Sequence, residues 1–177
     1  MRHALQFVAI TVIAVLTACA HVSKEKEYVR PTGVPPESLA IVTGSEVIDP
    51  SALNPDTRLY VVSIDGKLTM TGPKGWGERI PVLPGEHDLQ IGAARQSIFD
   101  DTFGSNSFHL NLEPGRTYAI RGDQPKQSGS DLKQVECWLE DDRGTKFDSV
   151  FVSLYPPIGG HGEYIIPVGK VYVPMVY

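Results

Sequence analysis

The chain has 177 residues, a formal net charge of −5 at pH 7, and 41% hydrophobic residues. This acidic balance argues against a nucleic-acid partner, because such a partner needs a basic stripe on the protein. It also argues against electrostatic adhesion to anionic lipid, which needs clustered Lys and Arg. The length is enough for one domain with a proper core, and 17 Gly with 14 Pro indicate a turn-rich β structure.

The N-terminus has the layout of an export signal. Arg2 supplies a basic start, and Leu5 to Leu16 is apolar except for Gln6 and Thr11. This run is about a dozen residues, whereas a membrane-spanning helix needs about 20. The run ends in Leu16-Thr17-Ala18-Cys19, which resembles the lipobox of bacterial lipoproteins. An ordinary secretory signal with an unrelated cysteine is the alternative.

The lipobox resemblance implies how the protein is processed and where it is held. Residues 1–18 would be a helical signal peptide, cut between Ala18 and Cys19, and Cys19 would carry a diacylglycerol and an N-acyl chain. Two or more acyl chains hold a protein stably in a bilayer. In these lipoproteins an aspartate after the cysteine favours the inner membrane, and here that residue is Ala20. In a Gram-negative cell this implies the outer membrane, facing the periplasm.

Beyond the anchor, the sequence divides into three parts. Residues 19–37 are polar and contain several Pro and Gly, which is typical of an extended tether. Residues 38–154 contain about eight short strand-like segments, with turn signals roughly every 8–12 residues. This spacing predicts an all-β fold, a single antiparallel β-sandwich, in which residues 99–107 form a polar loop. Residues 155–177 form an apolar C-terminal extension.

Two pairs of phrases in the sequence each resemble strands of known bacterial proteins. The first pair is Val62-Ser63-Ile64-Asp65-Gly66-Lys67 and the stretch from Val82 to Leu89, and it resembles the PEGA-type and transthyretin-like β-sandwich modules of bacterial envelope proteins. The second is the stretch from Leu112 to Tyr118 and Cys137-Trp138-Leu139-Glu140-Asp141, which is similar to strands of small lipoproteins. The resemblance lies in turn and core residues. It therefore implies a fold, and it brings no catalytic residues with it.

The cysteines exclude a disulfide framework. There are two of them, and the lipobox uses Cys19, which leaves Cys137 alone. Cys137 shares the apolar side of its predicted strand with Val135 and Leu139, so we expect a small buried core residue. A reactive thiol is the alternative, but it needs a basic neighbourhood, and the local sequence is acidic.

The sequence contains none of the common catalytic motifs, such as His-Glu-x-x-His or Gly-x-Ser-x-Gly. We therefore expect no catalytic residue, no metal, and no cofactor apart from the lipid on Cys19. Three residues are candidates for binding. Trp76, among glycines, can stack on a sugar or anchor a partner, unless its ring folds over the sandwich. Trp138 lies on the outward side of its strand, and His109 also points outward, where a simple solvated histidine is the alternative.

The C-terminal segment from Tyr164 to Tyr177 is almost wholly apolar, with Lys170 its one charged residue. Such a segment must pair with its own sandwich, add to a partner, or meet the membrane. The sequence thus favours a non-enzymatic envelope lipoprotein, an interaction or accessory module. Its partners would be the membrane and an envelope protein, the latter through this segment. The alternative is a glycan- or peptidoglycan-binding module, and an enzyme with a dispersed site is the third interpretation.

Overall fold

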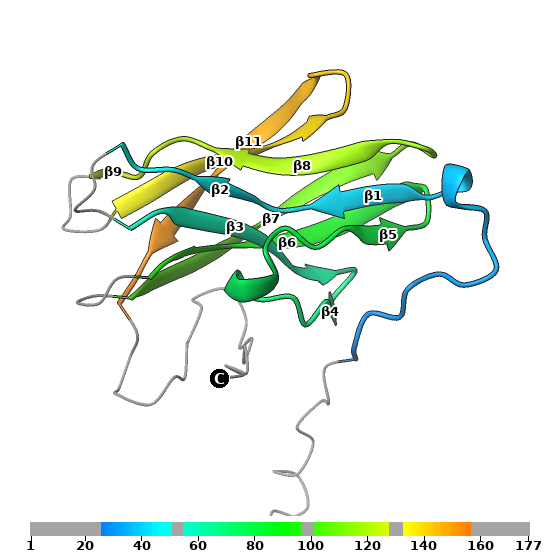
Figure 1. The fold of residues 1–177 in the computed structure, drawn as a ribbon, viewed down its shortest axis with the longest axis horizontal. Helices are drawn as coiled ribbons and strands as arrows, with labels where there is room; N and C mark the ends of the chain where they lie inside the picture. The colour runs from blue at the N-terminus through cyan, green and yellow to red at the C-terminus, as the bar shows by residue number, and fades with distance from the viewer. Residues whose placement is uncertain (1–25, 51–54, 97–100, 128–132, 157–177) are drawn as a thin grey trace, which may run out of the picture.

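The computed structural model describes residues 26–50, 55–96, 101–127 and 133–156, and these form a two-layered β-sandwich (Figure 1). Sheet A contains β2 (Ser45–Val47), β3 (Thr57–Ile64), β6 (Gly85–Arg95) and β7 (Thr102–Leu112), with β4 (Lys67–Leu68) beside β3. Sheet B contains, in order, β11 (Lys146–Leu154), β10 (Lys133–Asp141), β8 (Thr117–Gly122), β1 (Ala40–Thr43) and β5 (Ile80–Val82), with β9 (Lys126–Gln127) beside β10. The predicted all-β sandwich is confirmed.

One strand pair departs from the predicted antiparallel arrangement. Within the described residues the named strands pair in antiparallel fashion except β1 and β8, which run parallel. A parallel pair needs a long crossover, and the chain between β1 and β8 forms all the named strands of sheet A as well as β5. A local alternation pattern carries no information about this long-range pairing.

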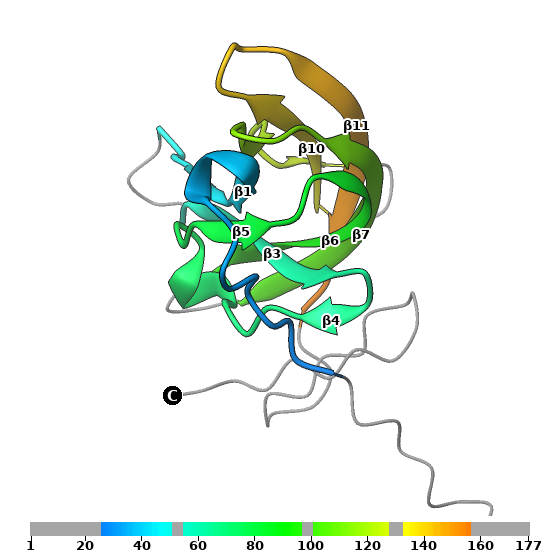
Figure 2. The ribbon, with the colours of Figure 1, turned by 90° about the vertical axis from the view of Figure 1, so that its right-hand side faces the viewer.

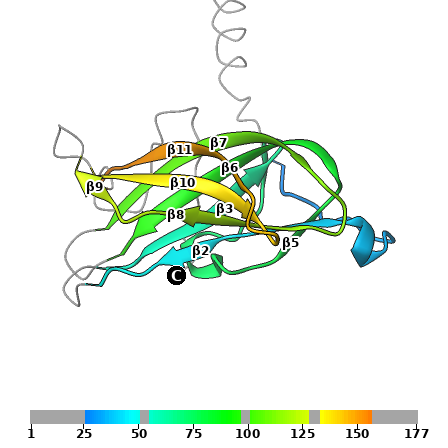
Figure 3. The same ribbon diagram turned by 90° about the horizontal axis from the view of Figure 1, so that it is seen from above.

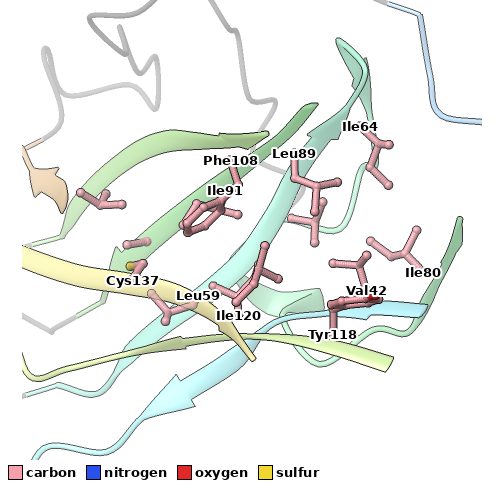
Figure 4. Close-up of a cluster of buried hydrophobic side chains, with 14 of the residues drawn as sticks. Val42, Leu59, Ile64, Ile80, Leu89, Ile91, Phe108, Tyr118, Ile120 and Cys137 are labelled. Atoms are coloured by element: carbon pink, nitrogen blue, oxygen red, sulfur yellow. The ribbon is translucent and has the colours of Figure 1, made fainter. Parts of the chain in front are cut away.

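The core lies between the two sheets, where alternate residues of each strand point inward (Figure 4). In β3 the inward residues include Leu59 and Val61, and in β8 they are Tyr118 and Ile120. Cys137 is fully buried in this core, as predicted. Burial, and secondarily the charge of Glu136, raises the pKa of the Cys137 thiol to about 12.

The two sheets are joined along both sides. On one side the chain passes from sheet B to sheet A at Gly44, between β1 and β2. On the other side β11 lies next to β7 (Figure 2), and Tyr155 and Phe103 exchange two backbone hydrogen bonds of 2.8 and 2.9 Å. The sandwich is therefore closed at both flanks by backbone contacts.

The prediction of a polar loop at residues 99–107 is wrong for residues 101–107, the part of this stretch that the structure describes. From Thr102 onward this stretch is β7, which pairs with β6 along its whole length. Its polar residues tolerate strand geometry because Ser105 and Ser107 lie on the outer face, while Asn106 donates a hydrogen bond to the Phe151 carbonyl. Gly104 is needed because β11 approaches closely: a Cβ there would lie 2.0 Å from the Ser153 carbonyl oxygen.

The segment from Lys26 to Arg30, within the expected tether, is bound to the sandwich. Tyr28 donates its backbone N–H to Leu68, and Leu68 donates its own to Lys26, at 2.8 and 3.0 Å. The Tyr28 hydroxyl reaches the Pro81 carbonyl on β5 at 2.9 Å. A short 3-10 helix, η1 (Pro36–Ser38), then leads into β1. Residues 1–25, including Cys19, lie outside the described residues.

Candidate functional site

The outer face of sheet B carries a partly exposed aromatic surface on β10 and β11, two strands that lie side by side in Figure 3. Alternation along β10 sends Val135, Cys137 and Leu139 into the core, which leaves Glu136, Trp138 and Glu140 outside. Trp138 pairs with Arg121 of β8 on one side and with Ser149 of β11 on the other.

Phe151 of β11 completes the aromatic surface. It pairs with Glu136, which places it diagonally across from Trp138, within reach of aromatic side chains. Phe151 is 58% exposed, which is unusual for a large apolar residue in the middle of a strand. We call this surface the Trp138 face and define it as Arg121, Glu136, Trp138, Glu140, Lys146 and Phe151.

Charged groups of both signs frame the aromatic rings. The Lys146 ammonium lies 3.9 Å from the centre of the Trp138 ring, a cation–π contact. The Arg121 Nε is 3.8 Å from a carboxylate oxygen of Glu140. Because one face of the Trp138 ring is covered by Lys146, a sugar could stack there only after displacing that ammonium. A protein partner can instead contact Phe151 and pair with the charges around it.

Trp76 has a different role in the structure. It follows a 3-10 helix, η2 (Pro73–Gly75), and its half-buried ring packs on the outer face of sheet A. There it meets a cluster of buried residues that includes Tyr60 and Val62. Its carbonyl oxygen accepts a hydrogen bond from Gly44. The ring and the backbone of Trp76 thus both contribute to the sandwich.

His109 lies on the outer face of sheet A, on the other layer from the Trp138 face. Its Nδ1 is 2.8 Å from a carboxylate oxygen of Asp88, in the neighbouring strand β6. The hydrogen bond and the negative charge of Asp88 raise the pKa of His109. Both side chains are largely exposed, at 68% and 73%.

A second histidine–aspartate pair stands beside the first. His87 Nδ1 is 2.8 Å from Asp65, and its Nε2 is 2.8 Å from the Leu83 carbonyl. Asp65 also accepts the backbone N–H of Asp88 at 3.0 Å. Although partial burial opposes ionisation, the bonds from His87 and Asp88 hold the pKa of Asp65 below its usual value. Both ring nitrogens of His87 are engaged, so this pair holds the β3–β4 turn against β6.

The sequence-based candidates therefore do not form one site. Trp76 and His109 belong to sheet A, and Trp138 belongs to sheet B. Sequence reasoning missed Arg121, Lys146 and Phe151, although strand alternation could have placed Phe151 outward with Glu136. It also missed Arg116, a buried arginine whose guanidinium pairs with Asp141.

Among the described residues, no group of three or more His, Cys, Asp or Glu side chains is arranged to hold a metal ion. None of the helices in that part of the chain has the length and apolar character needed to cross a membrane. No known protein family, curated protein or solved structure matches this chain.

Proposed function

We propose that this protein is a lipid-anchored, non-enzymatic interaction module of the bacterial cell envelope that binds another envelope protein through the Trp138 face. The observation that carries this proposal is the diagonal placement of a 58% exposed Phe151 and the half-buried Trp138 on neighbouring strands, inside a frame of Arg121, Glu136, Glu140 and Lys146. Aromatic and Arg side chains with a polar rim are typical of protein–protein interfaces.

The occupant that best fits this surface is a folded protein with an apolar spot and charges of both signs. The apolar spot would cover Phe151, which is otherwise exposed to solvent at an energetic cost. Charges of opposite sign would meet Lys146 and Glu136, which fixes the orientation of the two proteins more than it adds affinity.

Photo-crosslinking in living cells tests this surface. Benzoylphenylalanine at Phe151 keeps the phenyl ring and adds its benzoyl group on an exposed side chain, and the same probe at Ile48, which is 71% exposed, is the matched control. We expect a discrete protein adduct from position 151 only. Its yield should fall at least about tenfold in Glu136→Lys, because like charges placed opposite each other at an interface cost several kcal/mol, more than the roughly 1.4 kcal/mol of a tenfold change. Identical adducts from both probes, or an adduct indifferent to Glu136→Lys, would refute the proposal.

Glycan binding is the alternative function, and sedimentation with peptidoglycan sacculi tests it. Lys146 covers one face of the Trp138 ring, and Trp76 packs against the cluster that includes Tyr60 and Val62, so a sugar would have to displace existing contacts at either ring. If the protein instead sediments with peptidoglycan sacculi, and Trp76→Ala abolishes this sedimentation, the glycan-binding function replaces the protein-binding one.

The lipid anchor has a separate test. The lipobox resemblance assigns the acyl chains to Cys19, so Cys19→Ser should release the protein from membranes. Cys137→Ala is the control and should leave it in the membrane fraction, because Cys137 is buried in the core. A Cys19→Ser protein that stays with the membranes, or an N-terminal peptide without added lipid mass, would contradict the anchor.

A further inference from the structure

Sheet A carries a second buried cluster on its outer face, where an antiparallel sheet is normally polar and solvated. We call it the outer cluster and define it as Tyr60, Val62, Ala94 and Phe103, which are 5%, 6%, 0% and 9% exposed. Leu68 and Trp76 are the partly buried residues that pack against it within the described part of the chain. Such low exposure requires a cover over the whole cluster.

Leu68 and Trp76 account for one side of this cover. Leu68 belongs to β4, which pairs with β3, and η2, just before Trp76, also lies against β3. Phe103 belongs to β7, separated from β3 by β6. Neighbouring strands are about 4.8 Å apart, so Phe103 lies about 10 Å from β3 across the sheet. The β7 side of the outer cluster needs a cover that comes from elsewhere.

The C-terminal part of this chain is a candidate cover for the β7 side of the outer cluster. Tyr155, the residue after β11, is hydrogen-bonded through its backbone to Phe103 itself. Figures 2 and 3 both show β11 running beside β7 toward this edge of sheet A. The sequence beyond Pro156 therefore starts next to the outer cluster. It continues with Gly159, Gly160 and Gly162, which allow the chain to reverse direction.

We propose that the segment from Tyr164 to Tyr177 of this same chain packs on the outer face of sheet A and covers the outer cluster. Its side chains are apolar except for Lys170, which matches the character of that cluster. An extended chain spans about 3.3 Å per residue, so about six residues cross the roughly 20 Å width of four strands. Pro167 and Pro174 break a continuous hydrogen-bond ladder, so the segment covers the face with side chains.

The Trp138 face is a poor alternative for this segment. Covering the Trp138 face would remove water from Arg121, Glu136, Glu140 and Lys146. The segment has a single charged residue, Lys170, to compensate these four charges, and burying charges without compensating partners is costly. A second copy of the chain is also disfavoured, because a segment that starts beside its own outer cluster has a high effective concentration there. Self-docking thus leaves the Trp138 face open.

Photo-crosslinking of the purified full-length protein in detergent tests the docking. A benzoylphenylalanine at Ser105, on the outer face of β7 and opposite Gly92, lies beside the outer cluster. The same probe at Ser149, opposite Trp138 on sheet B, is the control. We expect the Ser105 probe to link to a peptide within residues 164–177 in monomers, with a yield independent of protein concentration, and the Ser149 probe to give no such link.

The opposite results overturn the docking. No link from Ser105 to residues 164–177 would leave the segment elsewhere, and a link that runs as a dimer and grows with concentration would assign it to a second copy. A link from Ser149 alone would place it on the Trp138 face. None of these results depends on the partner of the Trp138 face, so this docking and the proposed function can fail separately.

Discussion

The backbone N–H of Gly44 donates a hydrogen bond to the carbonyl oxygen of Trp76 at 3.0 Å. Gly44 is the point at which the chain leaves sheet B and enters sheet A, and Trp76 stands at the end of the loop that covers part of sheet A. The two backbones can approach because Gly44 has no side chain. A Cβ there would lie 1.9 Å from the Leu59 carbonyl oxygen and 2.4 Å from that of Trp76.

Gly44→Ala should therefore destabilise the sandwich strongly. Both obstructing atoms belong to the backbone, so the strands themselves must move, and we expect a loss of at least about 2 kcal/mol in the free energy of unfolding. Urea denaturation of the full-length protein in detergent measures this loss. Gly77→Ala is the matched control and should be nearly neutral, because a Cβ at Gly77 meets no atom within 4 Å. Equal effects of the two substitutions would refute the steric argument.

The buried guanidinium of Arg116 should be needed for stability. Its side chain is 7% exposed and pairs with Asp141, while its Nε lies 2.7 Å from Asp142. Although burial opposes ionisation of Asp141, backbone hydrogen bonds from Thr145 and Arg143, together with Arg116, keep the pKa of that carboxyl low. Arg116→Met leaves these carboxylates without their cation, so the midpoint of unfolding should fall clearly.

Two variants serve as controls for Arg116. Arg121→Met removes an arginine whose ion pair with Glu140 is half-exposed, and exposed pairs contribute little to stability. The double variant Arg116→Met/Asp141→Asn should be more stable than the sum of its single changes predicts. Simple additivity would mean that the two side chains act independently.

Local sequence patterns predicted those parts of the fold that depend on near neighbours. Asp65-Gly66 predicted a tight turn, and both residues have positive φ angles, 51° and 71°. Alternation also predicted that Cys137 and Trp138 lie on opposite faces of one strand. These features follow from the two-residue period of a strand and from the backbone freedom of glycine.

Features that depend on distant segments were not predictable. The sequence of the first half of β7 is polar and resembles a loop. Its strand geometry comes from distant segments, namely from pairing with β6 and from the approach of β11 to Gly104. The position of Lys146 over Trp138 depends on an irregularity in the β10–β11 register between Trp138 and Glu140. Strand alternation alone, without this irregularity, does not predict a contact between Lys146 and the Trp138 ring.

The pair of His109 and Asp88 should show a raised histidine pKa. Because Asp88 stabilises the protonated ring, the pKa of His109 should exceed the usual value of about 6.5. NMR titration of the histidine ring protons measures it. Asp88→Asn should bring the pKa of His109 down, and Glu86→Gln should lower it less, since Glu86 contributes only a weaker charge effect. An unchanged pKa in Asp88→Asn would contradict the observed hydrogen bond.

The same pair predicts the sign of a small pH effect on stability. A raised pKa in the folded state means that the folded protein binds the proton more tightly than the unfolded chain. The contribution is therefore complete below about pH 6.5 and is lost as the pH rises through the folded pKa of His109. Comparing unfolding midpoints of the parent protein and Asp88→Asn across pH 5–9 tests this. A stabilising effect of Asp88 that grows with rising pH would have the wrong sign.

Cys137 should be inert while the protein is folded. Burial, with a smaller effect of Glu136, raises the pKa of its thiol to about 12, so at pH 8 it is protonated as well as inaccessible to reagents. Iodoacetamide at pH 8 should leave the peptide that contains Cys137 unmodified in the native protein and modify it fully in urea, as measured by mass spectrometry. Rapid native modification would instead indicate an accessible thiol. Cys137→Ser should cost about 1–3 kcal/mol, because it buries a more polar hydroxyl in the apolar core, where the acceptor of the present thiol is the Val135 carbonyl, 3.9 Å from Sγ.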